Sequence, residues 1–559
     1  MSEIELQAML AECALQMIAQ REHLTASGRT NLLMAYVNEE ISFHGYEFLV
    51  DALLPDKGAA ISYITQNPEL FLTEYVYVEF EDVLGSLYLS CRNRSSRKAT
   101  GSYYTPAVIA RKMVDHLSGK NDMEGKTIFD PCCGTGTFLL QMPEEISIEN
   151  IYGNDIDAIA VCIARINLAL KYRTIDRELL CSHISCKDYL LFEKKEYFDF
   201  IIGNPPWGYH FSEEEKHALR EKYQCAKGSY IESYDVFTEQ AVSNLKCGGV
   251  LSFLIPEAIL NVRSHRWIRE FLMEENSFQY LEYLGEVFAY VQCPCIIMQI
   301  LHNCRHMDCV GMTVHDGTRV YTIRTAREVR AQYFCFTTTD EEYRILRKIE
   351  HVKQKVTLAG NAGFALGIVT GDNKKYITNV KTAENEVILK GLDIHNFRYT
   401  EGGNYITYQP ELFQQTAPTE YYRAKQKLLY RFICRRLVFA YDDRQTLSLN
   451  SCNILIPKIE GLDIKYILAV LNSSVAQFYF QKCFQSVKVL RSHIEQIPIA
   501  MVGKEGQEEI IRLADRMIKP SPEDDTEEIF KSLDNRIAQI YGLSQEEFEV
   551  VKHSVENLE

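Results

Sequence analysis

Residues 127–138 read TIFDPCCGTGTF, a short apolar run followed by a glycine-rich turn and the start of a helix. Gly134 and Gly136 permit a tight turn and let a ligand approach the backbone amides closely. Asp155 ends the next apolar run, in IYGNDID at 151–157, where a carboxylate can accept both hydroxyls of a ribose. The two stretches together predict a nucleoside-binding edge of a parallel sheet.

The surrounding sequence has the pattern of an α/β fold. From residue 126 to about 301, short apolar runs alternate with segments of helix length, which is typical of a parallel sheet with crossover helices. We expect strands at 127–129, 151–153, 200–202, 250–255 and 295–298, and a helix at 157–172. Residues 1–95 have apolar residues at helical spacing and predict a helical packing domain.

A second motif follows the strand expected at 200–202, where the chain reads GNPPWG at 203–208. Two prolines fix the backbone and leave the carbonyl of Pro205 without a local amide donor. With the side-chain oxygen of Asn204 it offers two acceptors to one planar NH2 group, and Trp207 offers a flat face to an aromatic ring. The motif predicts a site for an amine on a base, whose lone pair can attack an electrophilic methyl group in line.

Composition indicates a globular protein with an uneven charge distribution. The chain has 559 residues, 46% hydrophobic, and a net charge of -16. Residues 371–500 nevertheless hold 17 Lys and Arg against 12 Asp and Glu, so one basic region lies in an acidic protein. Residues 501–559 are acidic with helical spacing. The absence of a long uncharged apolar run and of a signal-peptide pattern predicts a cytoplasmic protein that does not contact a membrane.

The cysteines are expected to be reduced thiols rather than disulfides, because they are sparse in a long chain without an export pattern. Six cysteines and histidines could be drawn as a zinc site: Cys293, Cys295, His302, Cys304, His306 and Cys309. Their spacing is not a standard one, and residues 295–301 have the pattern of a buried strand. We therefore expect no metal.

The order of these motifs resembles a known family. TGSYYTP at 100–106, the loop at 130–138, NPPW at 204–207 and a long C-terminal region are similar to the gamma-class DNA adenine-N6 methyltransferases, in the TaqI-like and Eco57I-like layout. The resemblance implies a Rossmann-like class I methyltransferase domain at 96–320, after the helical domain at 1–95. It also implies a mixed α/β target-recognition domain at 340–500 and a helical segment at 501–559.

The resemblance assigns roles residue by residue. It implies S-adenosylmethionine as cofactor, contacted by Thr105, Asp130, Cys132, Gly134, Asp155, Ile156, Asp188, Tyr189 and Asn204. Asn204 and Pro205 would hold the target amine, Pro206 belongs to the same catalytic loop, and Trp207 and Phe288 would stack on the base. Thr105 also has the sequence of a helix N-cap, with Pro106 at the first helical position. Because a paired and stacked adenine is out of reach, the mechanism requires a flipped-out base.

Double-stranded DNA is the expected partner, contacted through the basic region. Its Lys and Arg are interleaved with tyrosines, and phosphate contacts need such a basic stripe. The candidate contacts are Arg423, Lys425, Lys427, Arg431, Arg435 and Arg436. A solvated charged surface is the alternative interpretation. A second cluster, Arg92, Arg94, Arg97 and Lys98, precedes the first motif and could contact DNA or nothing.

Other functions stay open on the sequence alone. The NPPW motif also serves enzymes that methylate glutamine side chains in proteins or guanine N2 in RNA, and a non-catalytic assembly subunit could retain the fold. The long C-terminal region favours DNA. A cytosine-carbon methyltransferase would need a cysteine nucleophile after a proline in the loop that follows the 200–202 strand, and none is present there. We expect no nuclease activity, because Pro55-Asp56 is followed by Glu79-Phe80-Glu81 without the lysine of a nuclease site. A separate restriction or defence subunit, or solitary action, are both compatible with the sequence.

Overall fold

The chain forms two compact units, residues 1–334 and 335–559, in a computed structural model. The structure describes residues 2–91, 104–193, 195, 197–288, 293–303, 305, 309–328, 333–334, 336–484 and 488–556. Residues 100–103 of the first motif, the basic cluster at 92–98, and the zinc candidates Cys304 and His306 lie outside the described residues.

The first unit is built on one sheet with strand order β3-β2-β1-β4-β5-β7-β6-β8-β9. Strands β3, β2, β1, β4 and β5 are parallel to one another, whereas β7 runs antiparallel between β5 and β6. The strand bounds are β1 Ile128–Asp130, β2 Ile151–Asp155, β3 Ile184–Cys186, β4 Phe198–Gly203, β5 Leu245–Pro256, β6 Asn276–Glu286, β7 Pro294–His302, β8 Thr313–His315 and β9 Val320–Thr322.

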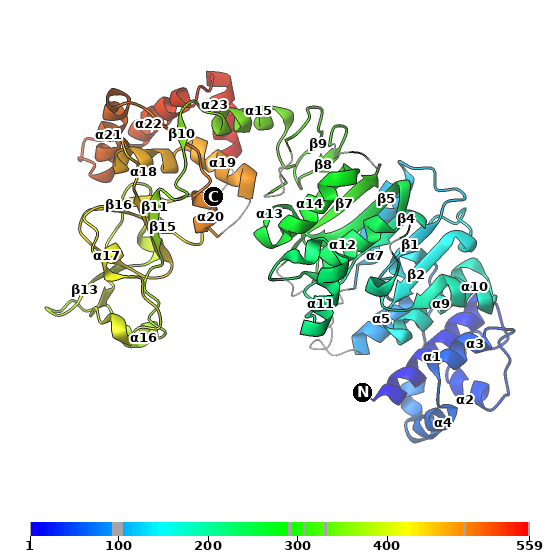
Figure 1. The fold of residues 1–559 in the computed structure, drawn as a ribbon. Helices are drawn as coiled ribbons and strands as arrows, with labels where there is room; N and C mark the ends of the chain where they lie inside the picture. The colour runs from blue at the N-terminus through cyan, green and yellow to red at the C-terminus, as the bar shows by residue number, and fades with distance from the viewer. Residues whose placement is uncertain are drawn as a thin grey trace. The chain divides into compact units, whose positions relative to one another are not determined.

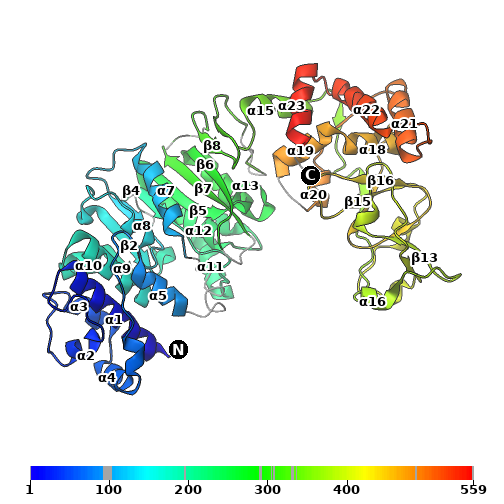
Figure 2. The ribbon, with the colours of Figure 1, turned by 180° about the vertical axis from the view of Figure 1, so that it is seen from behind.

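Helices lie on both faces of this sheet, with α12 and α14 on one face and α7 on the other (Figures 1 and 2). The helix bounds are α7 Ala107–Ser118, α8 Thr137–Leu140, α9 Ala158–Tyr172, α10 Arg177–His183, α11 Glu213–Lys222, α12 Ser233–Ser243, α13 Ala258–Asn261 and α14 Arg266–Glu275. Helix α9 begins where the Asp157 side chain accepts from the amides of Ile159 and Ala160, and it ends at Arg173 in the left-handed region.

The Rossmann-like α/β prediction is confirmed, with differences in detail. All five expected strands exist, and the helix expected at 157–172 is α9. Four strands of the sheet were not expected: β3, β6, β8 and β9. The sheet is mixed rather than parallel, because β7 inserts between β5 and β6 in the opposite direction.

The N-terminal residues are helical, and helices α1, α3 and α5 pack against α9 (Figure 1). Their helices are α1 Glu3–Arg21, α2 Leu32–Val37, α3 Glu47–Leu53, α4 Lys57–Gln66 and α5 Val83–Cys91. Helix α1 begins with a capping box between Ser2 and Glu5 and buries Leu10, Cys13 and Met17. This region belongs to the same unit as the sheet, so a separate domain at 1–95 stays a prediction.

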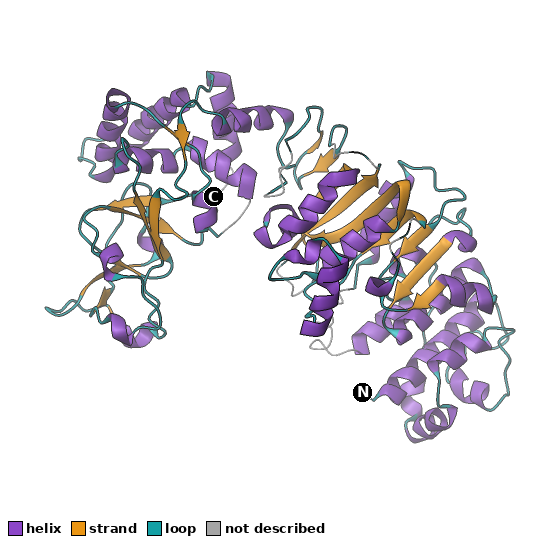
Figure 3. Ribbon diagram, viewed as in Figure 1, coloured by secondary structure: helices purple, strands orange, loops and turns teal. Residues whose placement is uncertain are grey.

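The second unit combines small sheets with helices (Figure 3). One sheet has the order β11-β18-β15-β16 and is antiparallel throughout, and another has the order β12-β14-β13-β17. Strands β10 and β19 form a further pair. The strand bounds are β10 Lys355–Val356, β11 Ala362–Ala365, β12 Ile377–Thr378, β13 Glu386–Leu389, β14 Tyr405–Ile406, β15 Lys427–Arg431, β16 Phe439–Asp442, β17 Leu447–Ser448, β18 Cys452–Pro457 and β19 Ile499–Ala500.

The helices of the second unit include both short turns and a C-terminal group. They are α15 Asp340–Glu350, α16 Asn373–Tyr376, α17 Thr419–Tyr422, α18 Ile464–Asn472, α19 Ser474–Phe484, α20 Arg491–Ile494, α21 Lys504–Ile518, α22 Thr526–Ile540 and α23 Gln545–Glu556. A mixed α/β second unit agrees with the expectation for residues 340–500, and the helices expected at 501–559 are α21 to α23. Across the residues that the structure describes, no helix is both long and apolar enough to cross a bilayer.

Candidate active site

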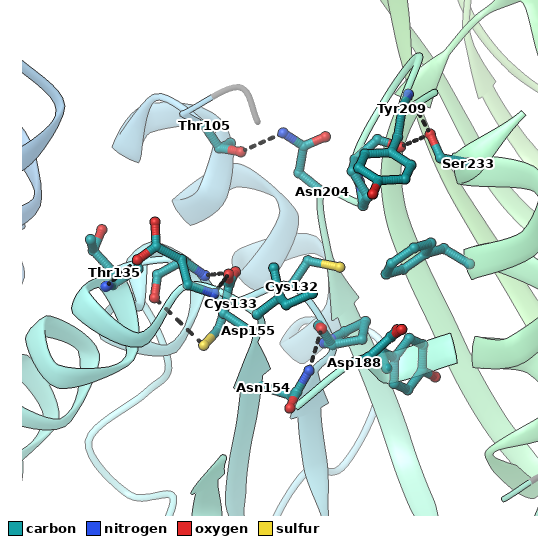
Figure 4. Close-up of a pocket in the computed structure, with 18 of the residues that line it drawn as sticks. Thr105, Cys132, Cys133, Thr135, Asn154, Asp155, Asp188, Asn204, Tyr209 and Ser233 are labelled. Atoms are coloured by element: carbon teal, nitrogen blue, oxygen red, sulfur yellow. Dashed lines mark hydrogen bonds between the residues drawn. The ribbon is translucent and has the colours of Figure 1, made fainter. Parts of the chain in front are cut away.

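A pocket of about 630 Å³ opens at the carboxyl ends of the parallel strands. This volume suits a cofactor-sized ligand, and such an edge is where open α/β sheets bind ligands. Nine of the predicted residues line it: Thr105, Cys132, Gly134, Asp155, Ile156, Asp188, Tyr189, Asn204 and Pro206. Figure 4 shows how several of them converge from separate loops.

The glycine-rich loop leaves β1 and forms one wall of the pocket. Gly134 and Gly136 have φ of +53° and +93°, which side chains rarely adopt. A side-chain carbon added at Gly134 would meet nothing within 4 Å, so the space above this residue is open. The loop therefore presents bare backbone to the pocket.

Asp155, at the end of β2, is hydrogen-bonded to the glycine-rich loop. Its Oδ2 accepts from the Gly134 amide at 2.8 Å, and its Oδ1 accepts from the Asp157 amide at 2.9 Å. Burial raises the pKa of this carboxyl, and the amide donors oppose that shift. Each oxygen has a second lone pair in addition to the one that its amide uses, which suits a diol such as a ribose.

Asp188 and Tyr189 lie on the neighbouring loop after β3. The Asp188 carboxylate is exposed and accepts from the Leu190 amide at 2.9 Å. Tyr189 is buried, and its hydroxyl donates to Asn244 Oδ1 at 2.9 Å. Its ring packs against Phe129 and Phe237, so Tyr189 contributes an apolar wall rather than a hydrogen bond to the pocket.

Asp130 differs from the prediction that it borders the cofactor. Its side chain is fully buried and lies beneath the loop, where Oδ1 accepts from the Cys132 amide at 3.1 Å. Burial raises the pKa of Asp130 well above its usual range. A side chain at Gly203 would collide with this carboxyl, at 2.6 Å from Oδ1. Asp130 supports the loop from below and does not line the pocket.

The NPPW loop leaves β4 on the opposite side of the pocket from Asp155 (Figure 4). The Asn204 amide nitrogen donates to the Thr105 hydroxyl at 3.1 Å. Helix α7 instead has Pro106 at its N-cap, without a side-chain cap, so the N-cap prediction for Thr105 is wrong. The Thr105 hydroxyl is used to orient Asn204.

Trp207 and Phe288 lie together beside this loop. Their ring centroids are 5.1 Å apart and the planes meet at 84°, an edge-to-face contact. Trp207 is only 6% exposed. The two residues expected to stack on a base are thus neighbours, and they pack on each other in this structure.

Helix α12 holds the NPPW loop, which the sequence did not predict. Ser233 Oγ donates to the Pro206 carbonyl at 2.6 Å, and Glu232 Oε1 accepts from the Gly208 amide at 2.7 Å. The pocket also contains residues that no motif marked, from α5, from the segment after NPPW and from α12: Tyr88, Leu89, Tyr209, Phe211, Glu215, Ser233 and Phe237. Apart from Leu89 they are aromatic or polar, a character too common in the sequence to single them out.

The predicted DNA contacts lie in the second unit and have different environments. Lys425 and Arg435 are exposed, and Arg436 is half-buried. Arg423 forms a bidentate pair with Glu386, at 2.6 and 2.7 Å, and Arg431 Nε donates to the Ile394 carbonyl at 2.8 Å.

Lys427 is not a surface residue. It is fully buried and pairs with the equally buried Asp442 at 2.7 Å. The prediction that Lys427 contacts DNA is wrong, because a buried and paired ammonium cannot reach a phosphate. Residues 427–430 of β15 are all buried, so no alternation along the strand marks Lys427 as an inward-facing residue.

The remaining zinc candidates have other roles. Cys295 Sγ donates to the Cys293 carbonyl, and His302 Nδ1 contacts Asn276 Oδ1 at 3.0 Å. Within the described ranges, no three His, Cys, Asp or Glu side chains gather as a metal site would require.

Two family profiles match the chain. N-6 DNA Methylase matches residues 79–329, and the TaqI-like C-terminal specificity domain matches residues 386–499. The Type II methyltransferase M.VspI of Vibrio sp. (strain 343) is 28% identical over 319 residues, which cover 56% of this chain and 74% of that protein. The Type II methyltransferase M.TthHB8I of Thermus thermophilus is 27% identical over 215 residues, covering 37% of this chain and 46% of that protein, so this chain spans less than half of that relative.

A solved structure has the same fold. The type IIL restriction-modification enzyme MmeI, in complex with DNA, aligns with a TM-score of 0.62 at 11% identity, over 100% of this chain and 99% of that chain. The fold and the pocket define a class I S-adenosylmethionine-dependent methyltransferase. The chain therefore contains an N-6 DNA Methylase domain at residues 79–329 and a TaqI-like C-terminal specificity domain at residues 386–499.

S-adenosylmethionine fits the residues present. The open space above Gly134 admits a ligand against the backbone, and Asp155 offers two oxygens to the ribose. Asp188 presents an exposed carboxylate suited to an adenine amine. Ile156 is 74% exposed at the rim, where an apolar side chain can cover the face of a purine.

Proposed function

We propose that this protein transfers a methyl group from S-adenosylmethionine to N6 of a flipped-out adenine at specific sites in duplex DNA. The observation that carries the proposal is the position of Asn204, which faces the same pocket as Gly134, Asp155 and Asp188. The cofactor supplies an electrophilic methyl group on a sulfonium. The acceptor amine is then held within reach of it by the loop at 204–207.

Asn204 and Pro205 would act on the target amine. Because the Asn204 NH2 donates to Thr105, the side-chain oxygen is oriented as an acceptor for the amine. The carbonyl of Pro205 is the second acceptor in this proposal. Two acceptors on its hydrogens favour a pyramidal nitrogen, so the lone pair is available for in-line attack. The methylated nitrogen then loses its surplus proton to water, because amide oxygens are too weakly basic to take it.

Trp207 and Phe288 would hold the extruded base. Removing an adenine from the stack costs a few kcal/mol, and aromatic stacking returns about 1 to 3 kcal/mol per base. Phe288 and Trp207 already pack edge-to-face, so the two rings lie close enough to contact one base together. Ser233 and Glu232 hold the loop that carries Trp207.

The biological role follows from the relatives. Both curated relatives described above have names that mark them as Type II methyltransferases, and MmeI is named as a restriction-modification enzyme. We place this chain as the modification component of such a system or as a solitary enzyme, acting in the cytoplasm without nuclease activity of its own. Magnesium-dependent cutting of unmodified DNA by the purified protein would contradict the last point.

One labelling experiment separates the substrates. Purified protein is incubated with tritiated S-adenosylmethionine and, in separate reactions, duplex DNA, RNA and a glutamine-containing release-factor protein. The proposal expects label in duplex DNA alone, and label in RNA or protein alone would overturn it. Long-read sequencing of DNA from cells with and without the gene then gives the modified base and its sequence context.

A further inference from the structure

The N-terminal helical region reaches the cofactor pocket through residues 82–91. Asp82 precedes α5, and Tyr88 and Leu89 on α5 line the pocket. Tyr104, which also lines it, follows in the chain. A region that the sequence predicts as a packing domain thus forms part of the pocket wall.

Asp82 is a buried carboxylate that ties this segment to the glycine-rich loop. It accepts from the Thr135 hydroxyl, from the Thr137 hydroxyl at 3.5 Å and from Asn167 Nδ2 at 2.7 Å. The two threonine hydroxyls donate to Oδ2, whereas Asn167 and the Gly85 amide, at 2.8 Å, both donate to Oδ1. Its side chain is 5% exposed, and burial raises the pKa of the carboxyl. A carboxyl this deep is costly unless such donors surround it.

Gly85 allows this approach. A side-chain carbon added at Gly85 would collide with Asp82 Oδ2 and with the Thr135 hydroxyl. Asn167 on α9 completes the contact, because its Nδ2 also donates to the Thr135 carbonyl at 2.9 Å. The loop between Gly134 and Gly136 is therefore held by α5 and α9 together.

Tyr88 makes a second connection, to the other side of the cofactor site. Its hydroxyl donates to Asp157 Oδ2 at 2.6 Å. Asp157 caps α9, and its own amide donates to Asp155 Oδ1. Residues 82–88 thus form hydrogen bonds with Thr135, which is adjacent to Gly134, and with Asp157, whose amide donates to Asp155.

We propose that Asp82 and Tyr88 are positioning residues of the cofactor site, which make the N-terminal region part of the S-adenosylmethionine-binding machinery. This inference rests on the proposed function for the identity of the ligand. A loop with two left-handed glycines has many alternative conformations, and affinity falls with the fraction of molecules in the binding conformation. The hydrogen bonds of Asp82 and Tyr88 hold the loop in its binding conformation in the free protein.

The test compares paired tyrosine variants. Tyr88→Phe removes the hydrogen bond to Asp157, and Tyr36→Phe removes a similar bond, from Tyr36 to Asp51 Oδ1 at 2.5 Å, in the same region but away from the pocket. Both tyrosines are largely buried. Asp82→Asn keeps the volume of Asp82 while removing its charge. The full chain is titrated with S-adenosylmethionine by calorimetry, and kcat and DNA affinity are measured at saturating cofactor.

We expect Tyr88→Phe and Asp82→Asn to weaken S-adenosylmethionine binding by about ten-fold or more, the usual effect of losing a hydrogen bond to a charged group. The kcat at saturating cofactor and the DNA affinity should stay within about three-fold of wild type. Tyr36→Phe should bind the cofactor as wild type does. Unchanged cofactor affinity in Tyr88→Phe and Asp82→Asn would overturn the inference, as would an equal loss in Tyr36→Phe.

The two proposals fail in different ways. If wild-type protein binds S-adenosylmethionine but labels no DNA, the proposed function fails while the positioning role is still tested by the affinities of the variants. If wild-type protein does not bind S-adenosylmethionine at all, both proposals are overturned. Should Asp82→Asn fail to fold, Tyr88→Phe against Tyr36→Phe still decides the outcome.

Discussion

Lys427 and Asp442 form an ion pair in the second unit that is buried on both sides. The ammonium also donates to the Tyr422 carbonyl at 2.6 Å, and Asp442 accepts from Tyr399, from the Thr446 amide and from the Thr446 hydroxyl. Burial lowers the pKa of Lys427, whereas the paired ammonium holds the pKa of Asp442 below its usual range against burial. Such a pair stabilises the fold only while both partners are present.

Lys427→Met should therefore destabilise the protein by about 3–5 kcal/mol, because it leaves the Asp442 carboxylate buried without its partner. Lys425→Met, two residues away and exposed, should change the free energy of unfolding by less than about 0.5 kcal/mol. Urea unfolding of the two variants measures both values. Equal and small effects would mean that the pair contributes little.

Particular residues show where the sequence was informative at this scale. Asn204, Asp155 and Gly134 could be placed in one pocket because each follows a predicted strand, and the carboxyl ends of neighbouring parallel strands meet. Asp130 and Lys427 could not be placed correctly, because their burial depends on residues far away in the sequence. Tyr88 and Ser233 carry no motif, and only the fold brings them to the site.

At the scale of elements, helices α19 and α20 show how burial sets a pH dependence. His493 on α20 stacks on Phe484 of α19, with ring centroids 4.5 Å apart. Burial lowers the pKa of His493 from 6.5 to about 4. Below pH 6.5 the unfolded chain takes up a proton that the folded chain does not, so stability falls as the pH drops from about 6.5 to 4.

His493→Phe should reduce this acid sensitivity while keeping a ring that stacks on Phe484. The urea midpoint, followed by circular dichroism, should fall less between pH 7 and pH 5 in the variant than in the wild-type protein. Other groups titrate in the same range, so the difference between the two slopes is the quantity compared. Identical slopes would show that His493 is not the responsible group.

The strands show why element-level prediction succeeded in part. The long apolar run of β5 and the buried run of β7 are visible in the sequence, because strands buried on both faces lack polar alternation. Strand β6 alternates polar and apolar residues and resembles a surface segment, whereas β3 has only three residues, Ile184–Cys186. The antiparallel direction of β7 is a property of topology that no local pattern contains.

At the scale of the whole molecule, catalysis and DNA recognition are assigned to different units. The pocket lies in the first unit, whereas the exposed cations Lys425 and Arg435 lie in the second, within the match to the TaqI-like specificity domain. The uneven charge indicated the basic region and the family resemblance implied the recognition domain, whereas the DNA contacts of Lys425 and Arg435 stay a prediction. The recognised DNA sequence was not predictable, because base reading depends on the placement of single side chains in a groove.

Lys425→Ala and Arg435→Ala should each weaken DNA binding across all sequences and reduce the slope of log affinity against log salt by roughly 1. Fluorescence anisotropy with duplex DNA at several salt concentrations measures the slope. Lys504→Ala, an exposed lysine at the start of α21, is the control and should leave the slope unchanged. If Lys425→Ala and Arg435→Ala both kept the wild-type slope, as the Lys504→Ala control should, neither residue would belong to the DNA interface.

The most direct test of the whole account is the amount of N6-methyladenine formed in duplex DNA by wild-type protein and by Asn204→Ala, measured by mass spectrometry of the digested nucleosides. The account predicts N6-methyladenine with the wild-type protein. In Asn204→Ala, kcat should fall by at least about 100-fold while the variant still binds S-adenosylmethionine. Undiminished methylation by Asn204→Ala, or a methyl group on any other atom of the DNA, would contradict it.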